Sequence, residues 1–109
     1  MITQIRAKDV SLSQHAREHI ESAMEVFLKF GLELTSVHCN LKAEKKGVNV
    51  EFDIHIAHAQ PVVISQSDDD LDAAIDLAID RASKALRRLH TKMTEHNGTS
   101  IKELETLDA

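Results

Sequence analysis

The sequence of 109 residues contains no tryptophan and no tyrosine, and only three glycines, one proline and one cysteine. This scarcity of glycine and proline excludes low-complexity linkers and a long disordered body. No apolar run approaches the roughly 18 residues that a membrane helix needs, and residues 1–10 lack the features of a signal peptide. The single Cys39 cannot form an intrachain disulfide and is typical of a reducing compartment. We therefore expect a cytoplasmic globular domain that does not contact a membrane.

Positive charge is also in short supply. Thirteen lysines and arginines stand against 18 aspartates and glutamates, which gives a formal net charge of −5. A nucleic-acid binder is usually basic, so this total argues against that class. The hydrophobic share of 42% suits one modest core. A total hides where the charges lie, and their distribution decides the interpretation.

The first third of the chain predicts a strand followed by a helix. Residues 2–6 are short and β-branched, which is typical of a strand. Ser11 and Ser13 are candidate N-caps of a helix that runs to about Phe30, with Gly31 as its C-terminal cap. Apolar residues at helical spacing form one face of this helix: Ala16, Ile20, Ala23, Met24 and Phe27.

From residue 37 the hydrophobic period changes to two. Residues 37–43 and 48–56 alternate between apolar and polar side chains, as half-buried strands do. Residues 44–47 predict the hairpin turn between them. A further turn at 58–61 leads into a short third strand of this meander, 62–64.

The segment from Ser67 to about His96 predicts a long helix that ends at Asn97 and Gly98. Its apolar stripe consists of Leu71, Ile75, Ala78, Ala82, Leu86, Leu89 and Met93. Each helix has one apolar stripe to bury, so we expect an α+β fold of order βαβββα. We expect an antiparallel four-stranded sheet with both helices packed on one face, similar to a double-stranded-RNA-binding domain. Residues 1–98 would form this domain, and 99–109 a short acidic tail, flexible or with a helical turn at 101–107.

Charge divides the long helix into two halves. The first half carries the acids Asp68, Asp69, Asp70, Asp72, Asp76 and Asp80, and the second half carries the bases Arg81, Lys84, Arg87, Arg88 and Lys92. This polarity favours the helix macrodipole, but the macrodipole acts on the end turns only, and the bases span about three turns. A basic ridge without carboxylates is what phosphate neutralisation requires. The pattern leaves polyanion binding and a merely solvated surface as alternatives.

A second basic cluster lies at the expected hairpin turn, where Lys42, Lys45 and Lys46 flank Glu44. Lysines near hairpin tips commonly keep a sheet soluble and prevent aggregation. The sequence does not say whether this turn lies beside the basic half of the long helix.

Other patterns favour ordinary structural roles. Residues 15–19, HAREH, match a zinc motif, but such a site needs a third ligand and a cleft, so we expect surface histidines and no metal. Cys39 lies in the inward phase of its strand, which favours a core position over a nucleophile. His38 and Asp53 are expected to face each other as a cross-strand pair. We expect no enzyme, no cofactor and no small-molecule substrate.

Residues 70–76 read DLDAAID. This stretch resembles D-M-Y-A-A-I-D in the bacterial ribosome hibernation-promoting factors, the family that includes YfiA. Residues 81–88 are similar to the family's next helix in the spacing of their bases around Leu86. Residues 13–17 resemble its T-x-x-L/I-R helix start, and residues 41–45 its L-K-x-E-K strand end. The resemblance covers residues 2 to about 96, and the βαβββα order is also the family's.

The resemblance implies a short-form ribosome-associated inhibitor that is a monomer off the ribosome. It would bind ribosomal RNA phosphates of the small ribosomal subunit, occlude the channel of mRNA and tRNA, and inhibit translation in stationary phase or stress. The implied RNA-binding residues are Arg17, Lys42, Lys45, Arg81, Lys84, Arg88 and Lys92, and the charge pattern adds Arg87 and Lys46.

The chain departs from the family pattern at three points. Asp72 stands where the family has tyrosine. The first helix carries Glu21 and Glu25 with only Lys29 in its second half. The three phenylalanines fit core positions, which leaves no aromatic ring for base stacking. Two alternatives stay open: a protein-interaction module that uses the acidic helix face, and a generic binder of duplex RNA.

Overall fold

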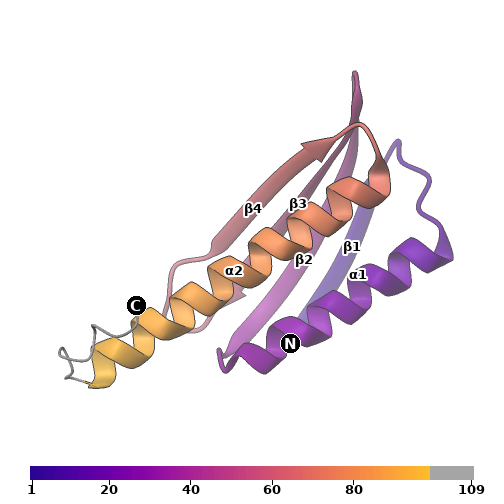
Figure 1. The fold of residues 1–109 in the computed structure, drawn as a ribbon. Helices are drawn as coiled ribbons and strands as arrows, with labels where there is room; N and C mark the ends of the chain where they lie inside the picture. The colour runs from indigo at the N-terminus through magenta and orange to yellow at the C-terminus, as the bar shows by residue number, and fades with distance from the viewer. Residues whose placement is uncertain (99–109) are drawn as a thin grey trace.

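The computed structural model describes the backbone of residues 1–98 and the side chains of residues 1–94. The chain forms, in order, β1 (Ile2–Lys8), α1 (Gln14–Phe27), the 3₁₀ turn η1 (Leu28–Phe30), β2 (Leu34–Glu44), β3 (Gly47–Ile56), β4 (Val62–Asp68) and α2 (Leu71–Gly98) (Figure 1). The expected order βαβββα is confirmed. The predicted tail, 99–109, lies outside the described residues. No described helix is long and apolar enough to cross a membrane.

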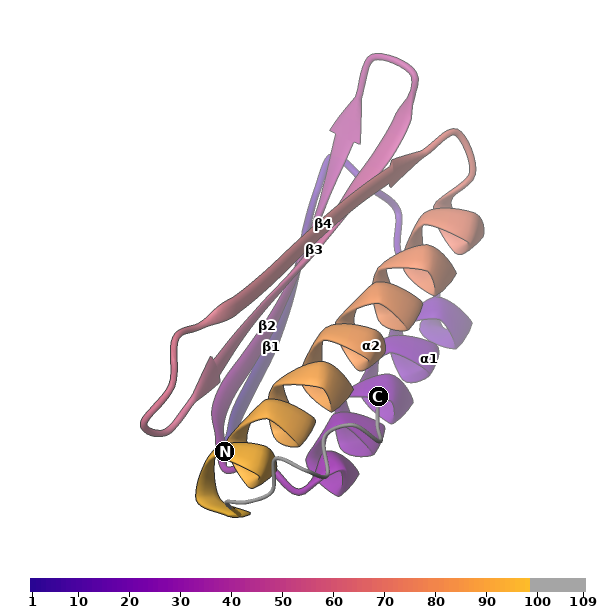
Figure 2. The same cartoon turned by 60° about the vertical axis from the view of Figure 1, so that its left-hand side comes forward.

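The four strands form one sheet in the order β1-β2-β3-β4, and both helices lie on one side of it (Figure 2). β2, β3 and β4 are antiparallel neighbours, as expected. β1 and β2 pair in parallel, so the prediction of a wholly antiparallel sheet is wrong. The reason is the connection: α1 carries the chain back along the sheet, so β2 starts at the same end as β1.

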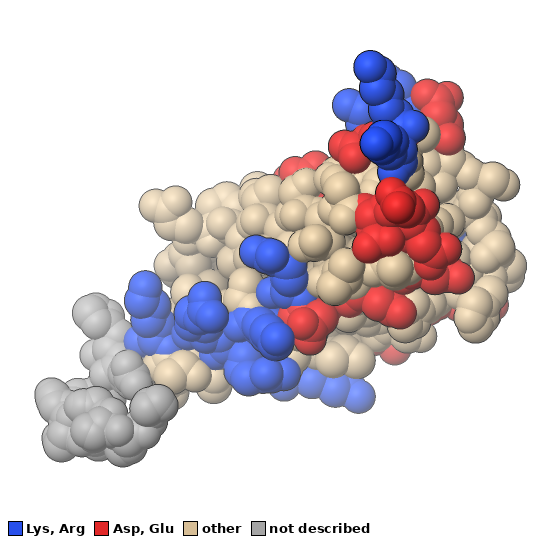
Figure 3. Space-filling model, turned by 45° about the horizontal axis from the view of Figure 1, so that its top comes forward, with Lys and Arg blue, Asp and Glu red and all other residues tan. Residues whose placement is uncertain are grey.

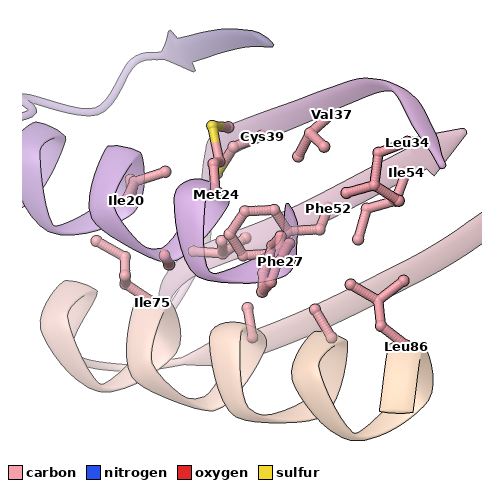
Figure 4. Packing of buried hydrophobic residues seen from close by; sticks show 14 of the residues in the cluster. Ile20, Met24, Phe27, Leu34, Val37, Cys39, Phe52, Ile54, Ile75 and Leu86 are labelled. Carbon is pink, nitrogen blue, oxygen red and sulfur yellow. The ribbon is translucent and has the colours of Figure 1, made fainter. Parts of the chain in front are cut away.

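The core lies between the helices and one face of the sheet. Every second side chain of β2 and β3 points toward the helices, and Val37, Cys39 and Phe52 have no exposed surface. Phe27 of α1 meets Phe52 edge to face, with 5.4 Å between the ring centroids and 82° between the ring planes (Figure 4). The five apolar positions predicted for the inner face of the first helix are all buried, which confirms that prediction.

β4 is longer than the sequence predicted. It continues past residue 64 to Asp68, because it pairs with β3 along its whole length. The side-chain amide of Asn49 on β3 donates to the hydroxyls of Ser65 and Ser67, both at 2.9 Å. These polar cross-strand bonds stabilise a segment without the apolar alternation that marks a strand.

The start of the long helix also differs from its predicted position. α2 begins at Leu71 instead of Ser67, and the Asp70 carboxylate accepts a hydrogen bond from the backbone N–H of Ala73, as an N-cap does. Ser13, one of the two candidates, caps α1 by accepting from the N–H of Ala16. Gly31 ends the turn after α1 with a φ of 83°, a conformation that favours glycine.

Candidate nucleic-acid interface

α2 buries one apolar stripe and exposes two halves of opposite charge. Its buried side chains are Ala74, Ile75, Ala78, Ala82 and Leu86. The exposed acids Asp72, Asp76 and Asp80 belong to the first half, and the exposed bases Arg81, Lys84, Arg87, Arg88 and Lys92 to the second half. These five bases are called the helix ridge below. The same buried stripe packs both halves of α2 against the sheet, so the two halves differ mainly in the charge of their exposed side chains.

The helix ridge borders two shallow hollows that share Lys84 and Arg88. The larger, about 430 Å³, is lined by Lys84, Arg87, Arg88, Thr91 and Lys92. The smaller, about 300 Å³, lies between α2 and β4, where Arg81 and Asp80 face Ile64. A concave strip with guanidinium and ammonium groups along it has the shape and charge to follow a phosphate backbone.

Carboxylates neutralise little of this charge. Within residues 1–94, Lys84 is the one ridge base in an ion pair, with Asp80 at 3.2 Å. Both side chains are more than half exposed, at 64% and 59%, and such a pair contributes at most about 0.5 kcal/mol. The Arg87 guanidinium lies over the Phe30 ring, 5.5 Å from its centroid, which holds the guanidinium plane in place. The ridge is therefore largely available to an external anion.

The β2–β3 turn with Lys45 and Lys46 does not lie beside the helix ridge. Gly47 at this turn packs against the β4–α2 corner: a Cβ there would lie 2.2 Å from the carbonyl oxygen of Asp68. The turn thus lies near the acidic start of α2, and Lys84 is about 20 Å further along the helix at 1.5 Å per residue. Figure 3 shows one basic group on the hairpin tip, a second along the later half of α2, and acids between them. Apart from Arg17, the predicted RNA-binding residues form two groups.

Arg17 belongs to neither group by any described contact. It is half-buried on α1, two residues before His19, whose Nε2 lies 2.8 Å from the carboxylate of Asp76. This contact joins the first turns of α1 to the acidic half of α2. Two residues span about 200° of a helix, so Arg17 points away from this contact. No ion pair or side-chain hydrogen bond in the described part of the chain joins Arg17 to the ridge.

Sequence reasoning passed over Arg6 and Lys8. The parallel register places Lys8 beside Lys42 and Arg6 beside Asn40, and the four side chains share the face of the sheet that the helices leave open. These residues and their intervening neighbours line a hollow of about 510 Å³. The alternation of residues 2–8 places Arg6 and Lys8 on one face of the strand. Their position beside Lys42 follows only from the parallel pairing of β1 with β2.

The remaining polar candidates have ordinary surroundings. Burial raises the pKa of the Cys39 thiol to about 12, so it stays protonated in the core and is not a nucleophile. His38 and Asp53 are cross-strand neighbours, as predicted, although the Asp53 carboxylate approaches His55, at 3.3 Å. In the described part of the chain no three histidine, cysteine or acidic side chains are grouped to hold a metal ion.

Fold and surface together define a small helix-on-sheet binding domain with an exposed basic ridge. The N-terminal domain of Protein Y from Thermus thermophilus has the same fold, with a TM-score of 0.69 and 22% identity over 79% of this chain and 94% of that one. A ribosomal subunit interface protein from Coxiella burnetii gives a TM-score of 0.70 and 17% identity over 84% of this chain and 99% of that one. No curated protein matches this chain in sequence.

Residues 3–94 match the sequence pattern of the family described as Sigma 54 modulation protein / S30EA ribosomal protein. The match spans most of the chain, which therefore belongs to this family. Its members are ribosome-associated hibernation and interface proteins, and they inhibit translation without enzymatic activity. The resemblance inferred from four short motifs is confirmed.

Proposed function

We propose that this chain is a cytoplasmic ribosome hibernation factor that binds the small ribosomal subunit through ribosomal RNA phosphates. Bound there, it occludes the channel of mRNA and tRNA and so inhibits translation in stationary phase or stress. The proposed RNA-binding residues are Arg17, Lys42, Lys45, Lys46, Arg81, Lys84, Arg87, Arg88 and Lys92. Off the ribosome the protein is a monomer.

The helix ridge is the observation that carries this proposal. Its five exposed bases lie along about three turns, and only Lys84 has a carboxylate partner within residues 1–94. Lysine and arginine contacts to phosphates release counterions, which supplies most of the sequence-independent affinity for a nucleic acid. Membership of a ribosome-associated family supports the proposal that this RNA is ribosomal. The Protein Y domain and the Coxiella burnetii protein share the fold of this chain. That similarity of fold is consistent with the proposal.

Sedimentation of the purified protein with purified small subunits tests the proposal. The protein is expected to travel with the subunit at low salt and to leave it as salt rises. Five phosphate contacts give a slope of log affinity against log salt of about −4, so a fourfold rise in salt weakens binding by roughly 250-fold. mRNA and tRNA bound beforehand should lower the amount of protein that cosediments, because they compete for the same channel.

Charge reversal of the ridge gives the matching variant test. Arg81→Glu/Lys84→Glu/Arg88→Glu should abolish cosedimentation and the inhibition of cell-free translation, because three attractive contacts become repulsive. A control, Ser11→Glu/Ser22→Glu/Gln60→Glu, adds acids at exposed positions outside α2 and should keep most of the affinity. If the wild-type protein stays at the top of the gradient at low salt, the proposed function is wrong. Equal affinity for an arbitrary RNA duplex would instead identify a generic duplex binder.

A further inference from the structure

The open face of the sheet carries its own basic cluster at the β1–β2 edge. Arg6 and Lys8 project from β1, and Lys42 projects from β2, all on the side away from the helices. All three are exposed, whereas Leu41, which points the other way, is 1% exposed. The parallel register makes Lys8 the direct neighbour of Lys42. Arg6, Lys8 and Lys42 are called the sheet patch below.

No ion pair neutralises the sheet patch within the described part of the chain, although Asp9 directly follows Lys8. The carboxylates nearest in register are Glu44, two residues beyond Lys42 on the same strand, and Glu51, which lies opposite Asn40. Neither forms an ion pair with the patch: in the described part of the chain, no carboxylate lies within 4.0 Å of Arg6, Lys8 or Lys42. Like charges on neighbouring strands destabilise a sheet. An external anion relieves that repulsion.

The cluster is also shaped to hold such an anion. Its bases border the hollow of about 510 Å³, together with Ala7, Asn40 and Leu41. Arg6 and Lys8 are two residues apart on one strand, a spacing of about 6.6 Å. Two successive phosphates of one RNA strand can occupy this length. A row of bases on a flat, shallow surface favours an extended polyanion over a compact acidic ligand.

The helix ridge and the sheet patch face opposite sides of the molecule. The ridge lies on α2, which packs on β3 and β4, while the patch lies on the uncovered face of β1 and β2 (Figure 2). A helix layer of about 10 Å and the sheet itself separate them. On the helix side, the acids of the first half of α2 lie between the ridge and the hairpin tip (Figure 3). One RNA strand that follows the ridge would have to leave α2 and pass round the sheet to reach the patch.

We propose that the sheet patch is a second RNA-phosphate site, so that the domain is held between two separate segments of ribosomal RNA, one on each face. Arg6 and Lys8 contact RNA in this arrangement, and Lys42 acts with them and not with the ridge. This inference rests on the proposed function, because it takes its RNA to be that of the small subunit. It adds a second contact surface, and it explains how an acidic protein gains enough phosphate contacts to bind.

Salt titrations of four proteins with purified small subunits test the two-site arrangement. These proteins are the wild type, Arg6→Gln/Lys8→Gln/Lys42→Gln, Arg81→Gln/Lys84→Gln/Arg88→Gln, and the control Ser11→Glu/Ser22→Glu/Gln60→Glu. Each triple removal should make the negative slope of log affinity against log salt shallower by about 2 to 3, since each base neutralises one phosphate. The control changes net charge by the same three units and should keep the wild-type slope. A sheet-patch variant that behaves like the control overturns the inference.

Directed cleavage of the RNA separates this inference from the proposed function. An iron chelate attached at Gln4→Cys, on the open face, and another at Thr91→Cys, beside the ridge, should cut ribosomal RNA at different segments. Cys39 is fully buried and stays unlabelled, so the wild-type protein is the blank. Cuts from Thr91 alone, with tight binding intact, overturn the second site and leave the proposed function standing. Failure of the wild type to bind the small subunit overturns both.

Discussion

The two halves of α2 share one helix and one buried stripe, yet their surfaces suit opposite partners. The first half carries exposed acids and meets α1 through the contact of His19 with Asp76, at 2.8 Å. The second half carries the helix ridge, where Lys84 is the one base in an ion pair within residues 1–94. The net charge of −5 belongs to the whole chain and describes neither half of α2. For RNA recognition, the local grouping of bases therefore matters more than the total.

Neutralising acids in the first half of α2 tests whether that half weakens RNA binding. Asp72→Asn/Asp76→Asn should tighten small-subunit binding by roughly 3- to 10-fold at low salt, because each exposed carboxylate near the RNA costs a few tenths of a kcal/mol or more. The gain should vanish at high salt, where screening acts within about 10 Å. Binding titrations at two salt concentrations measure it.

The matched control for this neutralisation lies on α1. Glu21→Gln/Glu25→Gln removes two exposed acids outside α2 and should have a smaller effect than the α2 pair. An equal effect would mean that total charge, and not the acidic half of α2, limits affinity. Weaker binding after neutralisation of Asp72 and Asp76 would mean that the acidic half itself contacts a partner on the ribosome.

A second comparison isolates the aromatic side chain that this chain lacks at residue 72. Asp72→Asn removes a carboxylate, and Asp72→Tyr removes it and adds a ring at an exposed position in the first turn of α2. Both should tighten binding about 2- to 3-fold through lost repulsion. If the ring also stacks on a base, the tyrosine variant should gain roughly a further 5-fold or more. Parallel titrations decide, and equal affinities of the two variants exclude stacking at this position.

The sequence predicted this molecule best where side chains repeat with a regular period. The inner face of α1, with Ile20 and Phe27, and the alternation around Phe52 identified the core, because burial imposes that period. The end of β4 escaped prediction, since the bonds from Asn49 to Ser65 and Ser67 leave no hydrophobic pattern.

The sequence predicted basic residues that lie on one element, but not those that strand pairing brings together. The helix ridge lies on one element, so helical spacing alone brings Arg81 to Lys92 together. The sheet patch depends on Lys8 meeting Lys42 across the sheet, and pairing of strands so distant in sequence has no local signature. The parallel direction of β1 is set by the crossover through α1. For the same reason, the sequence predicted the hairpin lysines as RNA-binding residues but did not predict where they lie relative to the ridge.

The smallest expected effect is on the stability of the free protein, where a substitution in the sheet patch is compared with one in the ridge. Lys8→Gln should raise the free energy of unfolding by a few tenths of a kcal/mol at low salt, because it removes the repulsion between direct neighbours on β1 and β2. Lys92→Gln is the control, since Lys92 is exposed in the last turns of α2 without a cross-strand neighbour. Urea denaturation at low and high salt measures both, and the gain from Lys8→Gln should disappear as salt screens the pair. A loss of stability in that variant would show that Lys8 already has a stabilising partner in the free protein, and would remove the argument that its charge is kept for an external anion.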